Sequence, residues 1–299
     1  MRLHRIISLP LMIVFGLSLS HGLAEERSGG VQTGQWNDGI ELEYESHGKR
    51  ASAALRIYFP KTSPGAGYRR VLIALHEYGR TNREWSDYTD IEQFADEFGF
   101  VIVCPNMGQT AYETKFYPET VRPWDGVPGG TWVGEILVPF LKKKYRLARD
   151  REATGILGIS SGARGALLIA CRYPGIFGAA AGISGFYDTS VLTDNRIISA
   201  VYGRRTLFKD RWENDDNIIE LASRLRNTRV FLAHAARDRE IPVEQSQLLG
   251  MRLRQLQKKS KDHYKFDYQE SESYHPQDWR RSRALIGDVM RFFDKNLER

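Results

Sequence analysis

Gly158, Ser160 and Gly162 form a Gly-x-Ser-x-Gly motif at a place in the chain where a serine hydroxyl can act as a nucleophile. Residues 153–159 before it are apolar and predict a short buried strand, and residues 162–172 predict a helix. A serine at such a strand-to-helix turn has a strained backbone and an exposed hydroxyl, and glycine is needed where a Cβ would collide with neighbouring backbone. The motif also occurs in ordinary tight turns, so its partners elsewhere in the chain decide the interpretation.

A nucleophilic serine of this kind needs an acid and a histidine, which follow it in that order, each on a loop after a later strand. Asp238 fits the acid because it follows the apolar segment 230–235, which predicts a strand. His275 fits the base because it lies in the loop after the last predicted strand, 264–270. The sequence therefore predicts acyl transfer by Ser160, His275 and Asp238.

These assignments have alternatives in the sequence. Glu240 is two residues from Asp238 and is the alternative acid, although Asp238 lies closer to the end of the strand. Asp238 itself has the alternative of a plain turn or N-cap residue. His234 falls within a strand and is expected in the core, and His263 falls in a charged, exposed turn. His275 is the only histidine in the loop that the arrangement demands.

The negative charge that develops on the attacked carbonyl oxygen needs two backbone N–H donors. One is expected at Ser161, where the helix after the nucleophile begins, and the other at Tyr78, in the loop after the apolar strand 70–76. At the end of that strand, His76 is expected either to brace the loop or to act directly.

Short buried strands alternate with amphipathic helices, which predicts an α/β fold with a mostly parallel sheet covered on both faces. Segments 41–46 and 53–59 predict an opening antiparallel pair, and segment 106–132 predicts a long loop. We expect a single domain over residues 41–299 after a polar leader, 25–40. The remaining predicted elements are strands 70–76, 100–104, 178–184 and 229–235 and helices 90–98, 133–145, 217–225, 243–259 and 278–297.

Residues 1–24 have the features of a secretory signal peptide, because Arg2 and Arg5 precede the apolar segment 6–19 and small residues end at Ala24. Its removal leaves 275 residues and lowers the formal charge from +6 to +4. The apolar segment is short for the about 20 residues that span a bilayer. We therefore expect a secreted or periplasmic protein without stable membrane insertion.

Other classes of site receive little support. The mild charge and the lack of a basic segment interleaved with aromatic residues argue against nucleic acid. No CxxC or HExxH spacing indicates a metal, and no cofactor is implied. Cys104 and Cys171 have apolar neighbours, which favours two buried thiols over a disulfide, although an exported protein can oxidise them.

On these residues, the chain resembles the putative-esterase family of α/β-hydrolases, which includes esterase D-like enzymes, feruloyl and acetyl-xylan esterases and mycolyltransferases. The resemblance covers most of the mature chain and implies that Ser160, Asp238 and His275 are nucleophile, acid and base. It implies a single α/β-hydrolase domain. The segments that carry it are LHEYG at 75–79, EILVPFLKKKYR at 135–146, Asp150–Arg151, GISSGARGAL at 158–167, Tyr187–Asp188, WEND at 212–215, Asp238, His275 and Asp278–Trp279.

Two residues depart from the pattern of the family. Glu77 stands where glycine is frequent, and it places a carboxylate near the developing negative charge unless Arg80 or Arg164 neutralises it. Ser161 replaces a common methionine, which is harmless because only its backbone is used.

The substrate is expected to be a small-molecule or polysaccharide-linked ester with a small acyl, aryl or sugar-linked group. Alternative functions are an acyltransferase to a sugar or lipid alcohol, a serine peptidase, and a non-catalytic binding protein on the same fold. Aromatic residues in loops can wall the site or belong to the core, and they are Tyr78, Trp85, Tyr117, Trp124, Tyr187 and Trp279.

Overall fold

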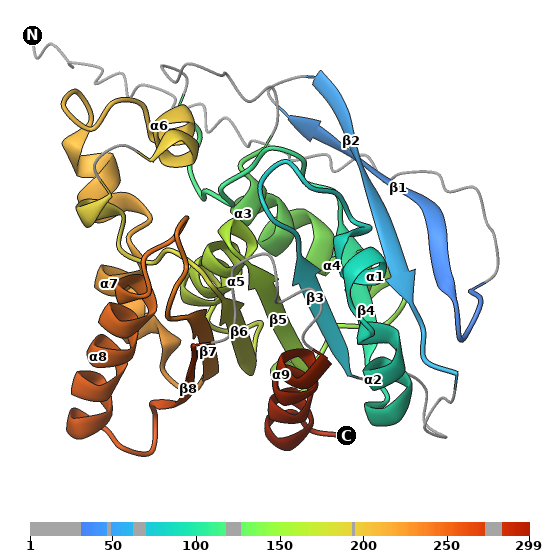
Figure 1. The fold of residues 1–299 in the computed structure, drawn as a ribbon. Helices are drawn as coiled ribbons and strands as arrows, with labels where there is room; N and C mark the ends of the chain where they lie inside the picture. The colour runs from blue at the N-terminus through green and yellow to red at the C-terminus, as the bar shows by residue number, and fades with distance from the viewer. Residues whose placement is uncertain (1–30, 47–48, 62–69, 118–126, 193–194, 273–282) are drawn as a thin grey trace, which may run out of the picture.

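The computed structural model describes residues 31–46, 49–61, 70–117, 127–192, 195–272 and 283–299. Within these ranges, one eight-stranded sheet crosses the molecule in the order β1-β2-β4-β3-β5-β6-β7-β8 (Figure 1). β2 is antiparallel to both β1 and β4, and every neighbouring pair from β4 to β8 is parallel. The strands are β1 Trp36–Ser46, β2 Lys49–Tyr58, β3 Val71–Leu75, β4 Val101–Pro105, β5 Thr154–Ile159, β6 Ala179–Ile183, β7 Arg229–Ala235 and β8 Lys265–Ser271.

Helices follow most of the parallel strands. The α-helices are α1 Glu84–Tyr88, α2 Ile91–Phe98, α3 Gly129–Trp132, α4 Val138–Lys144, α5 Ser161–Arg172, α6 Arg196–Tyr202, α7 Ile218–Leu221, α8 Glu244–Lys259 and α9 Arg283–Asn296. The π-turns are η1 Val133–Leu137 and η4 Arg211–Asp215, and the 3₁₀ turns are η2 Arg151–Ala153, η3 Thr189–Val191 and η5 Ala222–Leu225.

The parallel strands are buried on both faces, as their continuous apolar sequences predict. In β3, Val71 and Ile73 belong to the core beneath α4, α5 and α8, whereas Leu72 and Ala74 belong to the core beneath α2 and α9. Figure 1 shows α2 and α9 near one another, away from α5. The predicted α/β class and the two-sided covering of the sheet are confirmed.

The first strand begins earlier than the sequence predicts. Trp36 opens β1 inside the segment assigned to the polar leader, 25–40. Its ring lies 5.4 Å from that of Tyr58, and the guanidinium of Arg56 lies over it at 4.9 Å. The register shifts where Gly39 adopts a φ of 75°, so this bulge hides the strand pattern in the sequence.

Helical segments also differ in detail from the prediction. The segment 133–145 is continuous but begins with the π-turn η1, because Pro139 supplies no N–H and its ring crowds the preceding turn. The predicted loop 106–132 contains α3, and the predicted helix 217–225 changes from α7 to the 3₁₀ turn η5. α1 and α6 are short helices that the sequence did not predict.

Cys104 in β4 and Cys171 in α5 are buried and unbridged, which confirms the expected thiols. Burial raises the pKa of Cys171 to about 12, so this thiol stays protonated and unreactive at neutral pH. None of the helices in the described ranges has the length and apolar character needed to cross a bilayer. The predicted signal peptide, 1–24, lies outside those ranges.

Candidate active site

The predicted site residues follow the carboxyl ends of parallel strands. Ser160 follows β5, Tyr78 follows β3 and Asp238 follows β7. His275 is in the loop after β8 and lies outside the described residues. Carboxyl ends of parallel strands meet at one edge of a sheet, where ligands of α/β proteins bind. The fold thus brings the described candidates to the same edge.

Ser160 has the backbone geometry of a strained elbow, with φ 52° and ψ −119°. Such a conformation costs a non-glycine residue about 1–3 kcal/mol. Its N–H donates to the carbonyl of Ile183 in β6 at 2.9 Å, and its carbonyl accepts from the N–H of Arg164 at 3.1 Å. These two hydrogen bonds hold the elbow, and the serine side chain is only half-buried.

The flanking glycines are required by close backbone contacts. A Cβ on Gly158 would lie 2.1 Å from the carbonyl oxygen of Gly162, inside any allowed contact. A Cβ on Gly162 would lie 2.5 Å from the carbonyl oxygen of Leu75 and 2.7 Å from that of His76. The start of α5 therefore packs directly against the end of β3 and the loop that follows it.

His76 braces that loop as a neutral imidazole. Its Nδ1–H donates to the carbonyl of Glu77 at 2.6 Å, and its Nε2 accepts from the N–H of Met107 at 2.8 Å. The hydroxyl of Tyr112 donates to the carbonyl of His76 at 2.9 Å. Burial lowers the pKa of His76 to about 4, so both interactions persist at neutral pH. His76 was expected either to brace the loop or to act directly, and these contacts are those of a residue that braces the loop.

The neighbouring N–H groups in the loop have acceptors of their own. The N–H of Glu77 donates to the carboxylate of Glu84 at 2.7 Å. Gly79 donates to a carbonyl in the loop after β4 at 3.0 Å, and Arg80 donates to the carbonyl of Glu77 at 3.0 Å. For the N–H of Tyr78, no acceptor exists among the described residues. This donor is available to a ligand.

Ser161 supplies a second available donor. Its N–H stands at the first position of α5, where an amide has no partner within the helix. Across the described part of the chain, no other group accepts from it.

Arg80 and Arg164 were the two residues expected to neutralise Glu77. The described contacts of both lead to other groups. Arg164 is buried and donates to the carbonyl of Ala111 at 2.6 Å. The Nε of Arg80 lies 3.9 Å from the carboxylate of Glu84.

Asp238 presents a buried carboxylate with one oxygen unused. Its Oδ1 accepts from the N–H groups of Glu240 at 2.9 Å and Ile241 at 2.8 Å. Its Oδ2 is buried without a hydrogen-bond partner in the described ranges, and Nε2 of His234 is 3.5 Å away from it. Burial opposes ionisation of Asp238, but these donors outweigh it and hold its pKa below the usual value. Glu240 itself is exposed.

The described histidines are all engaged elsewhere. In His234, Nε2 donates to the carbonyl of Ile241 at 2.9 Å and Nδ1 accepts from the hydroxyl of Ser246 at 2.7 Å, which confirms its expected place in the core. His263, in the turn before β8, bonds the side chains of Arg226 and Asn227, which precede β7, at the opposite edge of the sheet. With His76 fixed in its loop, none of these three has a free ring nitrogen, and His275 remains the candidate base.

The aromatic candidates divide between core and surface. Trp85 and Tyr187 are fully buried, and the indole N–H of Trp85 donates to a carbonyl at the end of β3 at 3.2 Å. These two belong to the core. Tyr78 is half-exposed in the loop after β3. Trp124 and Trp279 lie outside the described residues.

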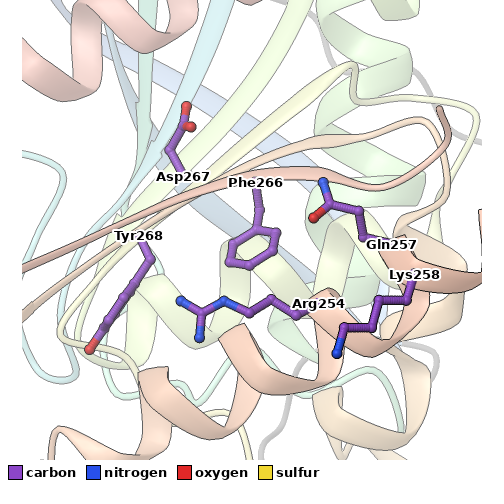
Figure 2. A pocket seen from close by; sticks show the side chains of 6 residues that line it. All are labelled: Arg254, Gln257, Lys258, Phe266, Asp267 and Tyr268. Atoms are coloured by element: carbon purple, nitrogen blue, oxygen red, sulfur yellow. The ribbon is translucent and has the colours of Figure 1, made fainter. Parts of the chain in front are cut away.

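A shallow surface pocket of about 520 Å³ lies between α8 and β8 (Figure 2). Figure 2 shows Phe266 on the side of Arg254, whereas Asp267 points away, as alternate residues of a strand do. Its lining includes none of the predicted site residues. In the described ranges, no group of three His, Cys, Asp or Glu side chains is placed to hold a metal ion.

The family model described as "Putative esterase" matches residues 47–292. The chain belongs to this family. Feruloyl esterase B of Neurospora crassa is 28% identical to the chain over 116 residues, a match that spans 38% of each protein. Among solved structures, an S-formylglutathione hydrolase from Agrobacterium tumefaciens has a TM-score of 0.66 at 16% identity, over 90% of this chain and 100% of that one.

A second structural relative, the fluorophosphonate-binding serine hydrolase F of Staphylococcus aureus, has a TM-score of 0.64 at 16% identity, over 88% of this chain and 99% of that one. At these identities the likeness establishes the fold, which is that of the α/β-hydrolases. Both the expected family and the expected fold are confirmed.

One buried residue of the site region was misjudged from the sequence. Arg164 is completely buried on α5, four residues after Ser160, and bonds to loops instead of to Glu77. The available signal was a charge in the first turn of a helix whose next seven residues are all apolar, since such a charge must find partners inside the fold.

Replacing Gly158 by alanine is expected to destabilise the protein by more than about 2 kcal/mol, because the new methyl would overlap backbone atoms of Gly162 that cannot yield. Urea unfolding measures this. Gly175→Ala is the matched control, since nothing lies within 4 Å of its added Cβ. Equal stability of the two variants would contradict the packing of the elbow.

The free energy of unfolding is expected to decrease as the pH is lowered from about 6.5 to about 4, because of His76. The folded state holds its pKa near 4, so the unfolded chain takes up the proton first as the pH falls. The contribution is complete above pH 6.5, and about 3 kcal/mol is lost by pH 4. In His76→Gln, an amide can make both hydrogen bonds without titrating, so urea unfolding at pH 7 and 4.5 should differ less. The same pH dependence in both proteins would contradict this assignment.

Proposed function

We propose that the protein is an exported serine carboxylic-ester hydrolase that cleaves small acyl, aryl or sugar-linked esters. The single observation that carries this proposal is the backbone of Ser160, at φ 52° on an elbow closed by Gly158 and Gly162. A serine kept in a strained conformation is retained for its hydroxyl, since glycine would relieve the strain. Membership of an esterase family supports the same reaction class.

In the first half-reaction, Oγ of Ser160 attacks the ester carbonyl carbon while His275 takes its proton. The carbonyl π electrons move to the oxygen, where the N–H groups of Tyr78 and Ser161 stabilise the charge. As the tetrahedral intermediate collapses, the bond to the alcohol oxygen breaks and His275 gives that oxygen the proton. The acyl group remains on Ser160.

In the second half-reaction, water attacks the acyl-enzyme and passes a proton to His275. The bond to Ser160 then breaks, the carboxylic acid leaves and the proton returns to Oγ. Asp238 holds the imidazole in the required tautomer and stabilises its charged form without taking the proton. Its buried Oδ2 is the group that this role needs.

The length of the chain after β8 supports His275 as the base. β8 and β5 are separated by two strands, so their axes are about 14 Å apart. His275 follows the last residue of β8 by four positions, a length that reaches at most about 14 Å. A loop of that length is long enough for an imidazole to reach the space between Asp238 and Ser160. Export rests on residues 1–24, whose composition is that of a signal peptide.

The proposal is tested with 4-nitrophenyl esters of acetic, butyric, octanoic and ferulic acid, with Ser160→Ala as the comparison. We expect turnover of at least one ester by the wild-type protein and only background rates in the variant, because alanine lacks the hydroxyl that attacks the carbonyl. The thermal midpoint should stay near that of the wild type or rise. Turnover that survives in Ser160→Ala rules out the elbow serine. Transfer to an added alcohol in place of hydrolysis identifies an acyltransferase.

Asp238→Asn is expected to lower kcat by about 10⁴-fold, because an amide cannot hold the imidazole in its working tautomer. Glu240→Gln removes an exposed carboxylate of the same turn and should change kcat by less than about twofold. Steady-state rates on the best ester of the panel measure both variants. The opposite order of effects assigns the acid to Glu240.

A further inference from the structure

Arg164 joins three separate parts of the chain beneath the nucleophile. Its guanidinium donates to the carbonyl of Ala111 at 2.6 Å, the hydroxyl of Tyr202 at 2.7 Å and the carbonyl of Asp216 at 3.1 Å. The side chain is fully buried. Its own N–H donates to the carbonyl of Ser160, so the residue is part of the elbow as well as of the junction.

The elements that Arg164 joins lie on both sides of the nucleophile. Ala111 is in the loop after β4, which we call the β4 loop, residues 106–117. Tyr202 and Asp216 are in the segment after β6 that we call the cap, residues 196–217. Because the sheet order is β4-β3-β5-β6, the strand that leads into Ser160, β5, has the β4 loop on one side and the cap on the other. Loops at this edge form the walls of a substrate site.

The cap and the β4 loop also contact each other through one aromatic and cationic stack. In Figure 1, α6 lies beside the green segment that leads to α3, and the rings of Tyr117 and Tyr202 are 5.3 Å apart. The guanidinium of Arg211 lies 4.6 Å from the ring of Tyr117 and 3.9 Å from that of Phe208. Arg164 lies 5.6 Å from the ring of Tyr202 on the other side. The stack runs from the half-buried Phe208 down to α5.

The carboxylate of Asp216 is a second link between the cap and the β4 loop. Asp216 is buried, and its Oδ2 accepts from the hydroxyl of Tyr202 at 2.9 Å and from the N–H of Thr114 at 2.8 Å. Arg172, two turns along α5, lies 3.1 Å from the other oxygen of Asp216. The contacts of Tyr202 form a relay, since it accepts from Arg164 and donates to Asp216. Loss of Arg164 would remove the donor that the buried carbonyls of Ala111 and Asp216 share. Because an unpaired buried acceptor is costly, the two loops would then shift.

We propose that Arg164 is a positioning residue that sets the distance between the β4 loop and the cap, and thereby determines which acyl groups reach Ser160. This inference rests on the proposed function. Small acyl groups need only the elbow and the N–H donors, whereas bulky acyl groups must also fit between the two loops. A misplacement of about 1 Å in such a wall can cost about 10²-fold in rate.

The test compares Arg164→Met with the wild type on 4-nitrophenyl acetate and on the bulkiest ester of the panel that the wild type hydrolyses. Rates are divided by the number of sites labelled with a small fluorophosphonate, which removes any effect of unfolded protein. We expect kcat/KM for the bulky ester to fall at least about tenfold more than for acetate. A merely structural role would lower both esters by the same factor, and that result overturns the inference.

Arg172→Met is the matched control, because it removes a cation that pairs with the same Asp216 but contacts neither Ala111 nor Tyr202. The ratio between the two esters should stay within about twofold in this variant. If Arg164→Met does not fold, Tyr202→Phe replaces it, since this change removes only the hydroxyl of the relay and should shift the ratio in the same direction. An unchanged ratio in Tyr202→Phe overturns the inference.

Failure of the proposed function has a different signature. A wild-type protein that neither labels nor hydrolyses any ester overturns the esterase and this inference with it. A wild-type protein that reacts with the fluorophosphonate but hydrolyses only the acetate ester overturns only the inference. No acyl group larger than acetyl would then fit between the two loops.

Discussion

The close contact between the end of β5 and the start of α5 is the constraint on which the candidate site depends. Two backbones approach at Gly158 and Gly162 to a distance that admits no side chain, and the chain between them must turn at Ser160 with a positive φ. The cost of that turn, about 1–3 kcal/mol, is offset by hydrogen bonds to β6 and within α5 and by the burial of the helix. The same contact presses α5 against the carbonyl oxygens at the end of β3. One steric condition therefore sets both the exposure of the hydroxyl and its place beside the loop of Tyr78.

Burial of α5 has a second consequence, in the loops above the sheet. Every residue of this helix from Ser161 to Cys171 is buried, so a charged side chain within it must be hydrogen-bonded. Arg164 finds three acceptors for its two terminal nitrogens in the β4 loop and the cap, which ties both segments to the helix, whereas its Nε has no partner among the described residues. A buried charge contributes little net stability even when it is paired, but loss of its partners is costly, which favours the one arrangement that supplies them. In this fold, that arrangement is the spacing of the segments on either side of the nucleophile.

The sequence predicts the parts of this architecture that depend on local pattern. Apolar segments such as 70–76 and 153–159 read as buried strands, and the glycines at 158 and 162 identify the elbow, because these signals lie within a few neighbouring residues. It does not predict the early start of β1, where a bulge at Gly39 interrupts the alternation, or the π-turn before Pro139. The partners of Arg164 lie about 50 residues before it and about 40–50 after it, so no local pattern reveals them.

The loop after β3 keeps a donor available although Glu77 stands where the resemblance to the family leads one to expect glycine. Glu77 uses its backbone on both sides, with its N–H held by the carboxylate of Glu84 and its carbonyl held by His76. Because His76 is neutral, it fixes the loop through directed hydrogen bonds and adds no charge. The amides of Glu77, Gly79 and Arg80 are bonded, whereas the N–H of Tyr78 between them has no acceptor among the described residues. A buried carboxylate and a buried imidazole hold this turn through hydrogen bonds that need no ligand. Under the proposed mechanism, a donor held in this way would meet the developing oxyanion without reorganising during the reaction, which favours catalysis despite the carboxylate of Glu77 in the same loop.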